Sequence, residues 1–177
     1  MRLQASLFLA LLSVLTLAVG VSGPGATAGS ARCGSGTHGS QGYAYAGHQS
    51  TSVAHGVRAT IAAIGTPAVQ EGHVAGWVGV GGPAGGPNGE DQWLQAGIAS
   101  LPRTAPLLYV EITRAGAEPV FRALRFDVEP GERHEIAVLE LAGRPGWWRV
   151  WVDGVPVTKP ISLPGSSKRW KPIATAE

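Results

Sequence analysis

Short apolar runs separated by turn residues make up most of the chain from residue 53 onward. The runs are rich in β-branched and aromatic residues, and Gly, Pro and Asp separate them at a spacing of about ten residues. No stretch keeps the helical period of about 3.6 residues. The pattern predicts an all-β protein, an antiparallel β-sandwich. The strands expected are 55–64, 73–79, 93–100, 107–113, 120–128, 135–141, 147–152, 155–163 and 170–176.

Asp153 and Gly154 give the strongest turn signal, because both residue types tolerate the positive φ that a type I′ hairpin turn requires. In the strand before this turn, alternation puts Trp147 and Trp151 on one face and Trp148 on the other. Only one of these faces can belong to the core. The pattern therefore predicts that at least one tryptophan lies at the surface.

The N-terminus has the three parts of a secretory signal peptide. Arg2 is followed by the apolar run 7–21, and Ala26 and Ala28 supply the small residues of a cleavage site. The run is shorter than the roughly 20 residues that a spanning helix needs. We therefore expect residues 1–28 to be removed and the rest to be secreted, without a membrane anchor after cleavage.

The composition after cleavage excludes several classes of function. Removing Arg2 leaves 13 basic residues against 12 acidic ones, so neither nucleic acid nor an anionic membrane is an expected partner. The five histidines are scattered, each is best interpreted as a solvated surface group, and no Cys/His cluster has zinc spacing. We expect neither a metal nor a cofactor.

The composition also divides the secreted chain. Residues 29–52 are rich in Gly, Ser, Ala and Thr, and we expect a flexible segment there. Residues 53–177 form the predicted sandwich domain. Cys33 is the lone cysteine, and Glu177 ends the chain within a predicted strand. Together these two features predict a domain that is incomplete at its C-terminus, with a second cysteine beyond it.

Residues 76–97 carry the candidate chemistry. Alternation puts Trp77 and Gly79 on one face of a strand, and Trp93, Gln95 and Gly97 on one face of the next. If the strands are neighbours, an amide lies among tryptophans over a floor that glycines leave open. In the alternative interpretation the tryptophans are core, the glycines relieve a tight bend and the amide is a satisfied polar group.

The run Trp-Val-Gly-Val-Gly-Gly at 77–82, followed by Leu-Gln-Ala-Gly at 94–97, resembles the glutamic peptidases. The strand Leu-Tyr-Val-Glu that ends at Glu111, the turn at 128–132 and the hairpin at 147–163 are similar to later parts of that family. The resemblance implies a concanavalin-like jelly roll and peptide-bond hydrolysis at acidic pH. It also implies a catalytic pair, Gln95 and Glu177.

In the mechanism that this resemblance implies, the Glu177 carboxylate acts as general base on a water that attacks the peptide carbonyl. The Gln95 amide orients the water and stabilises the developing oxyanion. Trp77, Trp93 and Glu111 are the implied substrate-binding residues, and a polypeptide is the implied partner. The surface tryptophans of 147–152 suggest an alternative, a non-catalytic extracellular sandwich that binds a glycan or another surface.

Overall fold

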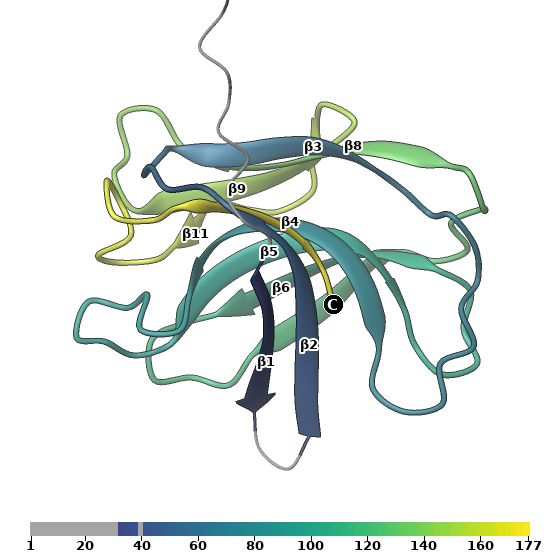
Figure 1. Cartoon of the computed structure of the whole chain (residues 1–177). Helices are drawn as coiled ribbons and strands as arrows, with labels where there is room; N and C mark the ends of the chain where they lie inside the picture. The colour runs from purple at the N-terminus through teal and green to yellow at the C-terminus, as the bar shows by residue number, and fades with distance from the viewer. Residues whose placement is uncertain (1–31, 39–40) are drawn as a thin grey trace, which may run out of the picture.

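Two antiparallel sheets packed face to face form the protein in a computed structural model, which describes residues 32–38 and 41–177 (Figure 1). The larger sheet has the order β1-β2-β12-β4-β5-β6-β7, and the smaller has the order β10-β9-β8-β3 with β11 also paired to β9. The predicted all-β sandwich is therefore confirmed. The strands are β1 Arg32–His38, β2 Gln41–Gln49, β3 Gly56–Ala62, β4 Val74–Gly82, β5 Gln92–Ser100, β6 Leu107–Thr113, β7 Val120–Arg125, β8 Arg133–Glu140, β9 Trp147–Val152, β10 Val155–Pro156, β11 Ile161–Ser162 and β12 Pro172–Ala176.

The core lies between the sheets and is built by strand alternation. Val78, Leu94 and Val110 point inward from the larger sheet, and Ile136 and Trp148 point inward from the smaller one. Each of these side chains is at most 1% exposed. Full burial of one such side chain contributes about 1.5–3 kcal/mol to folding, so this inner layer is the main source of stability.

The hairpin between β9 and β10 has the predicted turn. Asp153 and Gly154 have φ values of 51° and 77°, and Val152 pairs with Val155 across them. The predicted strand 155–163 is interrupted instead of continuous: β10 and β11 both pair with β9 but are separate. Pro156 and Pro160 lie in this stretch, and proline has no N–H to donate to a strand ladder.

The structure differs from the sequence prediction in the segment 29–52, because β1 and β2 occur where we expected a flexible chain. β1 pairs only with β2, and β2 pairs with β12. The pairing is made by main-chain hydrogen bonds, which a low content of apolar residues does not prevent.

The predicted signal peptide, residues 1–28, lies outside the described residues. Within the described part, no helix has the length and apolar character needed to cross a membrane.

The centre of the larger sheet depends on a close approach of β4 and β5 at two glycines. A Cβ atom at Gly97 would lie 2.1 Å from the carbonyl oxygen of Gly76, and one at Gly79 would lie 2.8 Å from that of Leu94. Both are backbone contacts, so no side chain can move aside to relieve them. These glycines therefore permit close packing of the two strands, a role that differs from the relief of a tight bend considered in the sequence analysis.

We predict that Gly97→Ala lowers the free energy of unfolding by about 1–3 kcal/mol, the usual cost of overpacking a well-packed site. The matched control is Gly76→Ala in the adjacent strand, where a Cβ would meet only Ile61 Cγ2 at 3.7 Å. Urea denaturation of both variants measures the difference. Equal stability of the two variants would show that the strands can separate without cost.

Candidate functional site

The outer face of the larger sheet, the side turned away from the smaller sheet, carries a second cluster of side chains. Its apolar part includes Ala75, Trp77, Ala99, Leu107 and Tyr109, with Tyr45 and Ile173 packed against it. Strand register arranges the face in rows, because cross-strand partners lie side by side. One row is Trp77–Gly97–Tyr109, and the next is Gly79–Gln95–Glu111.

Glu177 enters this face directly after β12. Its backbone exchanges two hydrogen bonds with Ala75 of β4, at 2.8 and 3.0 Å. Its carboxylate accepts hydrogen bonds from Trp77 Nε1 at 2.9 Å and from the Tyr45 hydroxyl at 3.2 Å, and it lies 3.4 Å from His73 Nε2. Two hydrogen-bond donors and the His73 ring therefore converge on one carboxylate whose side chain is 6% exposed. This is the arrangement that a buried charge requires.

Gln95 lies at the centre of the same face. It is 6% exposed, and its Nε2 donates to the Tyr109 hydroxyl at 3.3 Å. Its direct cross-strand partner on β6 is Glu111, whose carboxylate accepts a hydrogen bond from Trp93 Nε1 at 3.0 Å. The face therefore holds two carboxylates, each bound by an indole N–H, together with the amide of Gln95 on β5 and the phenol of Tyr109 on β6.

Tyr109 lies within electrostatic reach of both carboxylates. Burial is the largest cause that raises its pKa well above the ordinary value, and the charges of Glu177 and Glu111 raise it further. The hydrogen bond from Gln95 acts in the opposite direction. The phenol consequently stays neutral over the physiological range, and it can donate a proton in a hydrogen bond.

All five residues predicted from the sequence, Gln95, Glu177, Trp77, Trp93 and Glu111, lie on this outer face. The carboxylate directly opposite Gln95 is not the one that the resemblance implies as its catalytic partner. Glu111 lies directly opposite Gln95, whereas Glu177 lies opposite Ala75 and Gln95 lies opposite Gly79, four positions further along β4. Trp77 donates a hydrogen bond to Glu177, and Trp93 donates one to Glu111. In this structure the two tryptophans therefore position carboxylates.

Access to Glu177 depends on the side chains around it. The Tyr45 ring meets the Trp77 ring edge-on at 6.4 Å, and its hydroxyl binds the carboxylate. Because the glutamate side chain is almost fully covered, a peptide carbonyl reaches it only if covering side chains such as Tyr45 move. A water molecule is smaller than a peptide, so it can reach the Glu177 carboxylate with less movement of these side chains.

Sequence reasoning missed three members of this cluster, Tyr45, His73 and Tyr109. Tyr109 had a usable signal, because it lies two residues before Glu111 and strand alternation puts both on one face. Tyr45 was missed because β2 was not predicted. His73 was interpreted as a solvated surface group, and that prediction is wrong, since its side chain is 16% exposed and adjoins a carboxylate. Nothing in the sequence signals that contact.

Neither protein-family models nor curated proteins give a match to this chain. The resemblance to glutamic peptidases therefore rests on the motifs of the chain alone. Among residues 32–38 and 41–177, no group of three or more His, Cys, Asp or Glu side chains is arranged to hold a metal ion.

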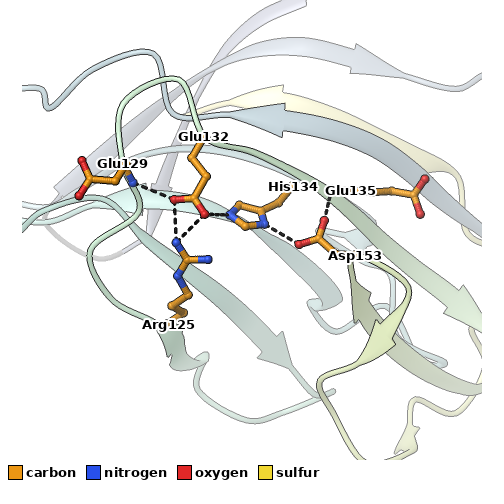
Figure 2. Close-up of polar contacts among 6 residues, drawn as sticks. All are labelled: Arg125, Glu129, Glu132, His134, Glu135 and Asp153. Atoms are coloured by element: carbon orange, nitrogen blue, oxygen red, sulfur yellow. Dashed lines mark hydrogen bonds and ion pairs between the residues drawn. The ribbon is translucent and has the colours of Figure 1, made fainter.

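A separate polar network ties the β7–β8 connection to the β9–β10 turn (Figure 2). His134 is 5% exposed, and its ring nitrogens lie 2.7 Å from Asp153 Oδ2 and 3.1 Å from Glu132 Oε1. Arg125 Nη2 lies 2.6 Å from both oxygens of Glu132, and the backbone N–H of Glu129 donates to the same carboxylate. His134 is thus a second histidine that the sequence wrongly placed at the surface. Every contact of this network joins loops or strand ends, so we assign it to stability.

The network predicts a specific response to acid. The hydrogen bond from Arg125 is the main cause that lowers the pKa of Glu132 from 4.5 to about 2. A lowered pKa means that the stabilisation is present above about pH 4.5 and is lost as pH falls toward 2. The free energy of unfolding should therefore fall more steeply over this range in the wild type than in Glu132→Gln.

Denaturant unfolding at several pH values measures this difference, with Glu118→Gln at an exposed loop position as the control. The control should follow the wild-type slope. Parallel curves for the wild type and Glu132→Gln would mean that the Arg125 contact contributes nothing to acid stability.

Proposed function

We propose that this protein is a secreted, acid-acting endopeptidase of the glutamic type, which hydrolyses peptide bonds with Gln95 and Glu177. The observation that carries the proposal is the outer-face cluster itself. A buried amide, two carboxylates and a neutral phenol share one face, and Gln95, Tyr109 and Glu111 belong to segments whose sequence resembles the family. Buried acidic groups with specific donors are typical of catalytic sites.

In the proposed reaction the Glu177 carboxylate takes a proton from water, and the resulting hydroxide oxygen bonds to the peptide carbonyl carbon. The carbonyl π electrons move to its oxygen, where the Gln95 amide supplies an N–H donor. The C–N bond then breaks as the amine nitrogen receives the proton held by Glu177. Tyr109 holds the amide through the hydrogen bond at 3.3 Å, so the donor is oriented before the substrate arrives.

The test is proteolysis of a denatured protein substrate at about pH 3–5, a window set by the carboxyl pKa. We expect Glu177→Gln and Gln95→Ala each to lower kcat by about 100-fold or more, the usual effect of losing a general base or an oxyanion donor. Glu71→Gln, at an exposed position, is the matched control and should keep wild-type activity.

The variant Glu111→Gln makes this test sharper, because Glu111 is the carboxylate directly opposite Gln95. If Glu111→Gln abolishes activity and Glu177→Gln does not, the general base is Glu111 and our assignment is wrong. An inactive wild type, folded by circular dichroism and tested over pH 3–7, would overturn the peptidase proposal altogether. The range of about pH 3–7 runs from roughly the ordinary pKa of a carboxyl group to neutrality.

A second candidate function is the binding of a glycan by the outer face of the smaller sheet. Trp148 is fully buried, whereas Trp147 and Trp151 are only partly buried on the opposite face, as alternation predicted. Arg144 lies over the Trp147 ring at 4.2 Å, and Arg149 lies 6.0 Å from the Trp151 ring. Tryptophan and arginine together can stack on a sugar ring and bind its hydroxyl or acidic groups.

For this function we predict that Trp151→Ala and Trp147→Ala reduce retention on an immobilised polysaccharide severalfold. The loss follows from removing the aromatic surface on which a sugar would stack. Phe126→Ala is the control, because Phe126 is an aromatic residue that is 62% exposed elsewhere on the protein. Equal retention of all three variants would exclude this face as a glycan site.

A further inference from the structure

His73 adjoins the carboxylate that the proposed reaction uses as its base. It directly precedes β4, and its Nε2 lies 3.4 Å from Glu177 Oε1. The two side chains are only 16% and 6% exposed. Trp77 binds the other oxygen of the carboxylate, and Tyr45 shares Oε1 with His73. The histidine is thus part of the set of groups that fixes this glutamate.

The contact is better described as an ion pair than as a hydrogen bond, because 3.4 Å exceeds the usual N–H···O range. Glu177 is the largest cause that raises the pKa of His73, burial opposes it, and the charge of Glu111 adds to the rise. The titratable groups that face this pair are Tyr45 on β2 and Tyr109 and Glu111 on β6. None of these neighbours supplies a positive charge.

We propose that His73 is a positioning residue for the peptidase reaction, whose imidazolium orients the Glu177 carboxylate and places a positive charge beside it. The inference rests on the proposed function, since it assigns His73 a role only if Glu177 is the base. A neighbouring positive charge favours the charged form of a carboxylate. General-base catalysis needs that charged form.

The sign of the pH dependence follows from the direction of the shift. A histidine whose pKa is raised in the folded state is fully charged below its ordinary pKa of 6.5. The pairing is therefore present throughout the acidic range and is lost as pH rises through the raised value. The greatest effect of His73 on catalysis should therefore appear at the acidic end, where its imidazolium is charged.

The first experiment compares the pH profile of kcat/KM for the wild type, His73→Gln and His73→Asn. Both substitutions keep a polar side chain and remove the charge. We expect the acid limb of the profile to move to higher pH, with a severalfold loss at the acidic end and a smaller loss at the maximum. The control is His55→Gln, which removes a histidine paired to Glu140 on the other sheet. That variant should keep the wild-type profile.

The second experiment needs no activity. The His73 ring is titrated by NMR in the wild type, in Glu177→Gln and in Glu111→Gln. Its pKa should fall most in Glu177→Gln, because Glu177 is the dominant cause of the rise. An unchanged His73 titration in Glu177→Gln overturns the ion pair.

The two experiments separate the inference from the proposed function. An active enzyme whose pH profile is unchanged in both His73 variants overturns the positioning role and leaves the peptidase proposal standing. A folded wild type that cleaves nothing over the whole pH range overturns the peptidase proposal and the positioning role with it, whatever the NMR titration gives.

Discussion

The close approach of β4 and β5 at Gly97 sets the register on which the outer face of the larger sheet depends. A side chain at this position would meet backbone atoms of Gly76 and Trp77, so the two strands can lie this close only because Cβ is missing. The register puts Trp77 opposite Gly97 and Gln95 opposite Gly79. Each large side chain on one strand thus faces a glycine on the other, which leaves room for the indole and the amide to lie side by side.

The same register explains how acidic groups can be buried on a sheet face. An ionised carboxylate away from water needs donors that replace its hydration. Trp77 supplies one to Glu177, and Trp93 supplies one to Glu111. Indole N–H groups suit this task because the ring packs as an apolar group while its nitrogen donates. The tryptophans of this face therefore serve packing and electrostatics together.

Period-two alternation is strong enough to assign faces from the sequence where strands have a buried side. It put Trp148 on the opposite face from Trp147 and Trp151, and the structure shows that the Trp148 face is the core. It also put Gln95 on the face of Trp93. It fails where order comes from pairing alone, as in β1 and β2, whose composition predicts no core. It also gives no information on contacts between distant loops and strands. His73 meets Glu177, and His134 meets Asp153, only through tertiary structure, so their burial was not predictable.

The two proposed activities place different demands on the side chains that would perform them. Stacking on a sugar needs an accessible ring face, yet Arg144 already covers Trp147 at 4.2 Å. A glycan would have to displace or share that guanidinium. Hydrolysis by the proposed route needs a carboxylate and an amide that are held in place before the substrate binds, and the outer face of the larger sheet holds both groups by hydrogen bonds. Glu177 has its donors in place, and Gln95 is held by Tyr109. Tyr45 packs edge-on against Trp77, and its hydroxyl binds the Glu177 carboxylate, so this side chain covers the proposed base.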